Sequence, residues 1–171
     1  MTVSRTYLSP LGRITLAAEA GKLVGLWFEG QKYFLGTLPE APLPGSDPVF
    51  EETERWLDAY FAGRDPGPLP PTAPRGSEFR QRVWASLAAI PYGQVTTYGA
   101  IAKELEKLTG RRQSARAVGG AVGHNPISII LPCHRVVGTN GSLTGYAGGV
   151  EIKRALLSLE GVELTEGSFA R

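Results

Sequence analysis

The spacing of apolar residues changes along the chain from a period of two to a helical period. Two alternating runs within residues 13–29, and a third from Val3 to Leu8, predict three strands near the N-terminus. Asp47 and Pro48 suit the cap and first turn of a helix that Gly63 would end. Its predicted buried face consists of Phe50, Trp56, Leu57, Tyr60 and Phe61. Residues 1–75 are therefore predicted to form a small α/β domain.

A proline-rich segment over residues 63–76 follows this domain. It contains five prolines in the sequence GRDPGPLPPTAPRG. Such a composition favours an extended and semi-rigid backbone rather than a helix or a central strand. We interpret the segment as a linker, which leaves residues 76–171 for a second domain.

Capping residues divide the first part of this second domain into three helices. Ser77 precedes the first helix, Thr96 or Thr97 the second, and Ser114 a short third one. The second helix would end at Gly110, and a short polar turn over residues 109–113 predicts a helix-turn-helix. The expected buried positions of the first two helices are Phe79, Val83, Trp84, Leu87 and Ile90, followed by Ile101, Ala102, Leu105 and Leu108.

Shorter elements are expected after the helix-turn-helix. The apolar run Ile127 to Leu131 predicts a strand, and Asn140-Gly141 predicts a tight turn. A last helix ends before Gly161, and its apolar positions are Ile152, Ala155, Leu156 and Leu159. The whole chain is thus expected to be of the mixed α/β (α+β) class.

Composition narrows the class of protein. The chain has 171 residues, 42% hydrophobic and 20% charged, which is enough to bury a core without staples. Its one cysteine excludes an internal disulfide, and with only two histidines beside it no zinc site is expected. No apolar run approaches the ~20 residues that span a bilayer, and the N-terminus lacks a signal-peptide pattern. We expect a cytoplasmic protein without a membrane partner, associated with the nucleoid if the source is bacterial or archaeal.

Charge and glycine content single out the segment from Arg111 to Gly123. The net charge is +2 overall, but residues 1–75 carry −2 and residues 76–171 carry +4. Arg111, Arg112 and Arg116 cluster around a predicted helix N-terminus, where backbone amides and arginines both suit phosphate. Glycines in a helix interior cost roughly 1 kcal/mol each relative to alanine. Either tight helix packing or the close approach of a ligand would explain them, and the arginines favour a nucleic-acid surface.

Cys133 is the candidate nucleophile. A lone cysteine is commonly a small buried hydrophobe, but Pro132 precedes this one, and His134 and Arg135 follow it. A nearby imidazole can take the thiol proton, and cationic neighbours lower the pKa of a thiol. In an extended backbone adjacent side chains point to opposite faces. A functional pair of Cys133 and His134 therefore needs a turn or a bridging water.

The sequence Ile130 to Gly138, ILPCHRVVG, resembles the active-site signature of the O6-alkylguanine-DNA alkyltransferases. The resemblance covers most of residues 77–161, because the order and spacing of several further pieces agree, whereas residues 1–75 resemble the family's variable N-terminal domain only in outline. These pieces are Pro91 to Tyr98, Arg116 to Gly119, Asn125-Pro126, Gly145-Tyr146 and Leu159 to Gly161.

This resemblance implies a fold and a reaction. The fold would be a small ribonuclease-H-like α/β domain followed by a helical domain that carries a winged-helix-like helix-turn-helix. Cys133 would accept an alkyl group from O6-alkylguanine in double-stranded DNA in a single turnover, without a cofactor or metal. His134 would act on the thiol through a water, and Glu160 would orient the imidazole. O4-alkylthymine as a second substrate stays open.

The resemblance also assigns the remaining site residues. Asn125 would hold the turn before the active site, Tyr98 would donate to the purine ring, and Arg116 would enter the duplex in place of the flipped nucleotide. Tyr146 would form a wall of the base pocket, with backbone groups of Val136 and Ala147 beside it. Ser128 and Thr144 would lie at the pocket edge. The protein would be a monomer that contacts the minor groove, with cooperativity on DNA left open, through Arg111, Arg112, Ser114, Ala115, Arg116 and Gly119.

Three alternatives are compatible with parts of the sequence. A non-catalytic protein that binds alkylated DNA and recruits excision repair would need the same surface but no reactive thiol. A thiol hydrolase would use Cys133 and His134 but leaves the Arg116 helix unexplained. A transcription regulator would use the helix-turn-helix, yet the glycine-rich helix lacks long polar side chains for reading base edges in the major groove.

Overall fold

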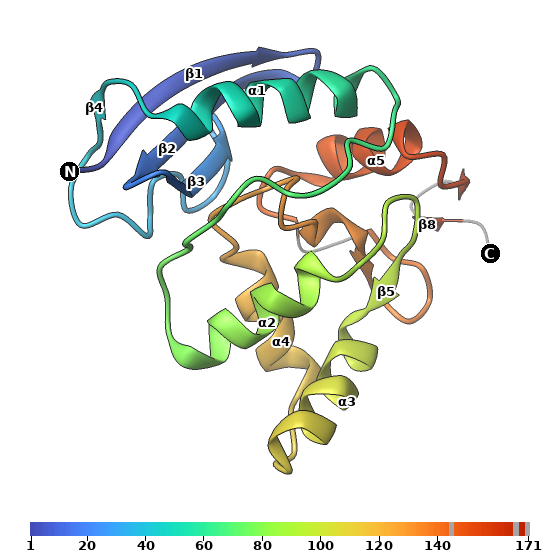
Figure 1. Cartoon of the computed structure of the whole chain (residues 1–171). Coiled ribbons are helices and arrows are strands. Elements are labelled where there is room, and N and C mark those ends of the chain that lie inside the picture. Colours follow the sequence, from blue (N-terminus) through green and yellow to red (C-terminus); the bar gives the residue numbers. More distant parts are fainter. Residues whose placement is uncertain (144–145, 166–167, 170–171) are drawn as a thin grey trace. The chain divides into compact units, whose positions relative to one another are not determined.

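The computed structural model describes residues 1–143, 146–165 and 168–169, and it divides into two compact units (Figure 1). The first unit comprises Met1–Gly76 together with Pro126–Ile130. The second comprises Ser77–Asn125 and Leu131–Arg171. The second unit is thus not contiguous in sequence, in contrast to the uninterrupted domain expected over residues 76–171.

The first unit is a sheet covered by one helix. Its strands are β1 (Val3–Ser9), β2 (Gly12–Glu19), β3 (Lys22–Phe28) and β4 (Leu43–Pro44), in the order β3-β2-β1-β4. Neighbouring strands run antiparallel except β1 and β4, which are parallel. Helix α1 (Pro48–Phe61) packs against β1, β2 and β3. The three predicted strands and the predicted helix are confirmed.

Asp47 ties the helix to the sheet. Its Oδ1 atom accepts a hydrogen bond from the backbone N–H of Val49 at 2.9 Å, which caps α1 as predicted. Its Oδ2 atom accepts from the N–H of Gly21 at 3.0 Å, in the turn between β2 and β3. Ala20 and Gly21 both have positive φ there, the conformation of a tight hairpin turn. One carboxylate therefore fixes two local structures.

Two distant segments cover the free edge of β3. Leu23 exchanges backbone hydrogen bonds with the proline-rich segment, donating to Pro71 O at 2.9 Å and accepting from Ala73 N at 2.7 Å. Leu26 does the same with residues 126–128, donating to Pro126 O at 2.8 Å and accepting from Ser128 N at 2.9 Å. An uncovered edge strand would present unpaired amides and carbonyls. The proline-rich segment is therefore partly docked on the sheet.

The strand predicted over Ile127 to Leu131 is wrong. Only Ile127 forms a β-bridge, with Leu26, and the chain then turns. Ile129 has φ of 71°, a conformation that branched side chains rarely adopt. A short apolar run predicts burial but does not distinguish a strand from a buried turn. Here the backbone partner lies about a hundred residues away in the sequence, and no local pattern reports it.

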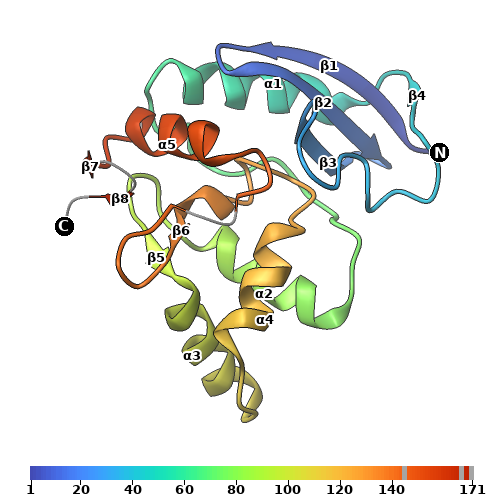
Figure 2. The ribbon, with the colours of Figure 1, turned by 180° about the vertical axis from the view of Figure 1, so that it is seen from behind.

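The second unit is mainly helical. Helices α2 (Glu78–Ala88), α3 (Tyr98–Thr109) and α4 (Ala115–Gly123) pack against one another, as both ribbon views show (Figures 1 and 2). Trp84 Nε1 of α2 donates to the carbonyl of Ala121 in α4 at 2.9 Å. The remaining elements are β5 (Thr96–Thr97), η1 (Cys133–Arg135), β6 (Val136–Val137), α5 (Val150–Leu159), β7 (Leu164–Thr165) and β8 (Ser168–Phe169).

Helix boundaries in this unit follow the predicted caps. The side chains of Ser77, Thr97 and Ser114 accept hydrogen bonds from backbone N–H groups of the first turns of α2, α3 and α4. Gly110 ends α3 in the left-handed conformation. Leu108 is an exception to the expected core, because it is 73% exposed. It lines an open groove between α2 and α3, and helical spacing does not report where a partner helix ends.

The buried face of α5 also differs from the expected one. Ile152, Ala155 and Leu159 are only half-buried, whereas Lys153, Leu156 and Leu157 are fully enclosed. The expected buried face did not include Lys153, because lysines are rarely buried. The buried face of α5 is thus rotated from the expected one, and it includes the charged residue Lys153. Among the described residues, no helix has the length and apolar character needed to cross a membrane.

Candidate active site

Cys133 begins a single turn of 3₁₀ helix rather than a strand. The Cys133 N–H donates to Leu131 O at 2.7 Å, and the Arg135 N–H donates to Pro132 O at 2.9 Å. The Val136 N–H then donates to the carbonyl of Cys133, which closes the turn at its far end. The side chains of Cys133 and His134 are buried, at 4% and 0% exposure. The turn that a Cys–His pair requires is therefore present.

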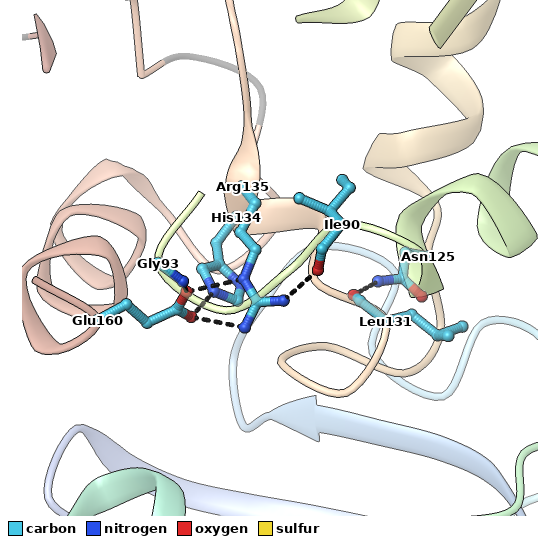
Figure 3. Close-up of polar contacts among 7 residues, drawn as sticks. All are labelled: Ile90, Gly93, Asn125, Leu131, His134, Arg135 and Glu160. Carbon is cyan, nitrogen blue, oxygen red and sulfur yellow. Dashed lines mark hydrogen bonds and ion pairs between the residues drawn. The ribbon is translucent and has the colours of Figure 1, made fainter. Parts of the chain in front are cut away.

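A carboxylate at the end of α5 holds the histidine. Nε2 of His134 donates to Oε2 of Glu160 at 2.5 Å, and neither side chain is exposed (Figure 3). Glu160 is the residue that caps the C-terminus of α5. Because Nε2 carries the proton that is hydrogen-bonded to the carboxylate, the buried Nδ1 atom carries the lone pair of the neutral ring. The structure thus brings together His134 and Glu160 as the resemblance implies.

Arg135 binds the same carboxylate as His134 (Figure 3). Its Nε donates to Oε1 of Glu160 at 2.7 Å and its Nη2 donates to Oε2 at 3.1 Å. Its Nη1 donates to the carbonyl of Ile90 at 2.7 Å, and the N–H of Gly93 donates to Oε1 of Glu160 at 3.0 Å (Figure 3). A bidentate arginine–carboxylate pair fixes both groups in one plane. These contacts hold the Glu160 carboxylate in one orientation independently of its hydrogen bond to the imidazole.

Burial sets the protonation state of the histidine. It lowers the pKa of His134 below its usual value, although the Glu160 carboxylate acts in the opposite direction. The charge of Arg135 lowers that pKa further. The imidazole is therefore neutral at neutral pH and able to accept a proton. This is the state that a general base requires.

The thiol is also shifted by burial, and in the direction opposite to the prediction. Burial raises the pKa of Cys133, against the opposing effects of a hydrogen bond from Asn125 and of the charge on Lys153. The expected lowering by His134 and Arg135 is wrong, because Arg135 is committed to Glu160 and His134 is neutral. The resting side chain is accordingly a thiol rather than a thiolate.

Asn125 and Tyr98 come to this site from the two helices of the helix-turn-helix. Asn125 follows α4, and its Nδ2 donates to the carbonyl of Leu131 at 2.7 Å (Figure 3). Tyr98 is the first residue of α3, and burial together with the charge of Cys133 raises the pKa of Tyr98 to about 12. Its hydroxyl therefore stays protonated and can donate a hydrogen bond. Asn125 and Tyr98 thus both interact with Cys133, Asn125 through a hydrogen bond and Tyr98 through charge.

The residues assigned to the base pocket are only partly described. Tyr146 and Val136 are buried and Ala147 is half-buried. A side chain on Gly148 would come within 2.6 Å of the Tyr146 ring, so Gly148 is needed for that ring position. Ser128 is buried and belongs to the first unit. Thr144 lies outside the described residues.

The residues assigned to DNA contact lie on the exposed side of α4 and of the turn before it. Arg111, Arg112 and Arg116 are exposed, as are Ser114 and Ala115, while Gly119 is half-buried. A Cβ atom at Gly119 would meet only the Tyr98 ring, at an ordinary 3.8 Å, and at Gly120 it would meet nothing. Helix packing therefore does not require either glycine, and the close approach of a ligand remains as their explanation.

Two domain models of one protein family match the two parts of this chain. The ribonuclease-like domain of 6-O-methylguanine DNA methyltransferase matches residues 2–67, and the DNA-binding domain of the same family matches residues 78–162. The chain belongs to the 6-O-methylguanine DNA methyltransferase family.

Relatives of this methyltransferase family match over nearly the whole chain. The methylated-DNA–protein-cysteine methyltransferase of Mycobacterium bovis is 46% identical over 156 residues, 91% of this chain and 90% of the relative. The Methanosarcina acetivorans protein of the same name is 45% identical, covering 90% and 94%. The crystal structure of Mycobacterium tuberculosis O6-methylguanine methyltransferase has a TM-score of 0.77 at 45% identity, covering 94% and 93%. A Mycobacterium tuberculosis OGT in complex with DNA has a TM-score of 0.76 at 44% identity, covering 92% and 91%.

Three contacts at the site of this methyltransferase family member were missed by sequence reasoning. They are the Arg135 clamp, the backbone donor at Gly93 and the buried Lys153, whose Nζ donates to Val136 O at 2.5 Å. A polar residue inside an apolar helix pattern was the one available signal for Lys153. Among the described residues, no group of three or more His, Cys, Asp or Glu side chains could hold a metal ion.

Proposed function

We propose that this protein repairs DNA by moving an alkyl group from O6 of alkylguanine to the Sγ atom of Cys133. The observation that carries the proposal is the buried hydrogen bond by which Glu160 orients the neutral imidazole of His134, the residue next to Cys133 in the same buried turn. Glycine-rich α4 and its arginines supply a surface that a duplex can approach closely. Membership of the methyltransferase family supports both parts.

The reaction begins with loss of the thiol proton. Because burial keeps Cys133 protonated at rest, a base must remove that proton, and neutral His134 takes it through one water. The imidazolium that forms is stabilised by Glu160, which its Nε2–H already contacts. The thiolate of Cys133 therefore forms only when His134 removes the thiol proton.

Alkyl transfer is a displacement at carbon. The Cys133 thiolate attacks the alkyl carbon, a sulfur–carbon bond forms, and the bond between that carbon and O6 breaks. The electron pair of the broken bond passes to O6 and the purine ring, where the Tyr98 hydroxyl donates a hydrogen bond or proton. The products are guanine and an S-alkylcysteine. The carbon–sulfur bond of this thioether is stable, so each molecule acts once.

The lesion must leave the duplex before it reaches the thiol. O6 lies within the base pair, and Cys133 is only 4% exposed, so the nucleotide is flipped out at a cost of a few kcal/mol. Arg116, exposed on α4, fills the space that the nucleotide leaves. Helix α4 lies in the minor groove, where its small residues let the backbone approach. Arg111 and Arg112 neutralise phosphates.

The protein acts as a monomer in the cytoplasm, where it meets chromosomal DNA. Tyr146 forms one wall of the base pocket, and the backbone groups of Val136 and Ala147 contact the purine edge. The burial of both Tyr146 and Val136 supports this assignment. The number of protein molecules bound per duplex is measured by DNA-binding titrations alongside the repair assay.

Transfer from labelled DNA tests the proposal. The protein is incubated with a duplex oligonucleotide that carries O6-methylguanine with a tritiated methyl group, and label on the protein is measured against protein concentration. We expect a plateau of one label per molecule and an intact-mass increase of one methyl group on the peptide that contains Cys133. Cys133→Ser is the matched control, with label at background and DNA binding retained. Duplex binding without label on the wild-type protein would instead favour a non-catalytic lesion-binding protein.

A further inference from the structure

A surface turn contacts the buried carboxylate of the candidate site. Residues 91–94 form this turn, in which the N–H of Gln94 donates to the carbonyl of Pro91 at 3.1 Å. Gly93 is exposed, whereas the side chain of Glu160 is fully enclosed. The N–H of Gly93 nevertheless donates to Oε1 of Glu160 at 3.0 Å (Figure 3). A backbone group at the protein surface is therefore part of the buried hydrogen-bond network.

The turn requires glycine at position 93 for two reasons. The φ of Gly93 is 78°, in the left-handed region that residues with a side chain rarely adopt. A Cβ atom there would also lie 3.3 Å from the backbone oxygen of Glu160, which is closer than an ordinary contact. The absence of a side chain therefore lets the turn approach the end of α5 closely enough for its N–H to reach the Glu160 carboxylate.

The donors on Glu160 match the capacity of a carboxylate, which has about four lone-pair positions. Oε1 accepts from the N–H of Gly93 and from Nε of Arg135. Oε2 accepts from Nε2 of His134 and from Nη2 of Arg135. Without the N–H of Gly93, a buried anion would lose one of these donors, which is costly in a site that is closed to solvent. The N–H of Gly93 thus helps to fix the plane of the carboxylate that the imidazole meets.

The donors come from two separate parts of the chain. His134 and Arg135 belong to η1, the same turn that carries Cys133. Gly93 belongs instead to the segment between α2 and β5. A carboxylate held by η1 alone would move with that turn. A donor from a second segment fixes Glu160 relative to the rest of the unit, so that His134 meets the carboxylate in one geometry.

The contribution of Gly93 is separable from the charges of the network. The charges that act on His134 are those of Glu160, Arg135 and Lys153, which come from α5 and η1. Gly93 carries no charge, so loss of its N–H leaves each of these groups in the protein. An effect of that N–H on proton removal by His134 is therefore an effect of carboxylate position.

We propose that Gly93 is a positioning residue for alkyl transfer, whose backbone N–H holds the Glu160 carboxylate in the orientation that stabilises protonated His134. The inference deepens the proposed function and rests on it for its biological role. Its physical content concerns proton removal from Cys133, which a small alkylating reagent measures without DNA. A failure of either proposal is thereby distinguishable from a failure of the other.

Replacement of Gly93 by glycolic acid tests the hydrogen bond alone. This change converts the peptide bond between Tyr92 and Gly93 into an ester, which removes the N–H and adds no side chain. The matched control is the same replacement at Gly141, whose φ is 83° and whose N–H donates to the carbonyl of Gly138 at 2.8 Å. The second-order rate of Cys133 alkylation by iodoacetamide is measured from pH 6 to pH 10, and circular dichroism establishes that each protein is folded.

We expect the ester at position 93 to slow alkylation at neutral pH about tenfold, the lower end of what a hydrogen bond to a charged group contributes. At high pH hydroxide removes the thiol proton without His134, so the rates of the ester and of the wild-type protein should converge. A merely structural defect would change the rate at every pH. The ester at position 141 should behave as the wild-type protein. In Glu160→Gln protein the ester at position 93 should cause no further loss, because the carboxylate that it positions is absent.

Three results would overturn the proposal. They are a wild-type rate in the ester at position 93, a loss of equal size at every pH, and a loss that adds in full to that of Glu160→Gln. If this ester does not fold, hydrogen exchange decides the question. The N–H of Gly93 should then exchange about tenfold faster in folded Glu160→Gln than in the wild-type protein, and equal exchange rates would contradict the contact.

Methyl transfer from labelled duplex is measured in parallel with wild-type protein. A protein that shows the expected effects with iodoacetamide but takes no label from DNA would contradict the proposed function. It would leave the effect of the Gly93 N–H on the thiol established.

Discussion

Two regions of the second unit are built by opposite rules. Around η1 and α5 the charged groups are buried and each has a fixed partner, as in the contacts of Glu160 with His134 and Arg135. On α4 and the turn before it the arginines are exposed, and glycines leave the helix surface flat. The first region controls the orientation of reacting groups, and the second offers charge and close approach. Substitutions in the first region should therefore slow the reaction with both duplex DNA and the free alkylated base. Substitutions in the second region should slow only the reaction with duplex DNA.

Glu160→Gln should produce the largest effect and should not discriminate between substrates. The amide leaves His134 without its charge partner and Arg135 without a bidentate carboxylate, so proton removal from Cys133 slows. General acid–base assistance of this kind contributes about 10²–10⁴-fold. We expect losses of that order with both methylated duplex and free O6-benzylguanine, measured in single-turnover assays. Glu163→Gln, an exposed neighbour, is the control. A loss confined to duplex DNA would contradict the proposed relay.

Gly119→Leu should abolish most duplex repair and spare the free base. The leucine would stand on the face of α4 that we propose to approach DNA, where a Cβ has no protein neighbour closer than 3.8 Å. Leucine also favours a helix more than glycine does by up to about 1 kcal/mol, so loss of the helix is not expected. Fluorescence anisotropy with a lesion-free duplex should show weakened binding. Wild-type repair of duplex DNA by the folded variant would place the recognition surface elsewhere.

Arg116→Ala should have a smaller effect of the same kind. In the proposed mechanism the arginine fills the space of the flipped nucleotide, so its removal should slow repair even when the duplex is saturating. The free base needs no flipping and should react at the wild-type rate. Arg111→Ala is a useful comparison, because loss of a phosphate contact should weaken affinity and reduce its salt dependence by about one unit of log–log slope. Equal losses of Arg116→Ala on both substrates would assign the residue to the chemistry or to the fold.

The smallest effect concerns the stability of the buried relay toward acid. Burial lowers the pKa of His134, whereas the imidazole of the unfolded chain is protonated near pH 6.5. The unfolded state therefore binds more protons below pH 6.5, and the free energy of unfolding falls as the pH falls, by up to about 1.4 kcal/mol per pH unit. Urea unfolding at several pH values measures this slope. His134→Asn should flatten it, and His124→Asn should not.

Local signals in the sequence predicted much of the fold. Ser77, Thr97 and Ser114 cap their helices through hydrogen bonds to residues three positions away, so the information lies within one turn. Strands β1, β2 and β3 follow from apolar runs a few residues long, whereas the two-residue strand β4 was not predicted. In contrast, the turn at Ile129 depends on pairing with Leu26, which no window of neighbouring residues contains.

The candidate site divides in the same way. Cys133 and His134 are adjacent, and their chemistry could be proposed from their order alone. The Arg135 clamp on Glu160 spans 25 residues, and the burial of Lys153 depends on how α5 is rotated against η1. Sequence reasoning therefore gave the wrong source for the cation that acts on Cys133. The rotation of a helix is fixed by tertiary packing, which overrides the local pattern.

The covered edge of β3 has a consequence for the order of events during synthesis. Strands β1 to β3 emerge from the ribosome early, but the residues that pair with Leu26 are Pro126 and Ser128. Until they emerge, part of this edge presents open amides and carbonyls to other chains. By that time the three helices α2, α3 and α4 have already been made. The first unit thus begins to be synthesised first but is completed only after these helices. A nascent chain stalled before residue 126 should therefore be the species most prone to aggregate.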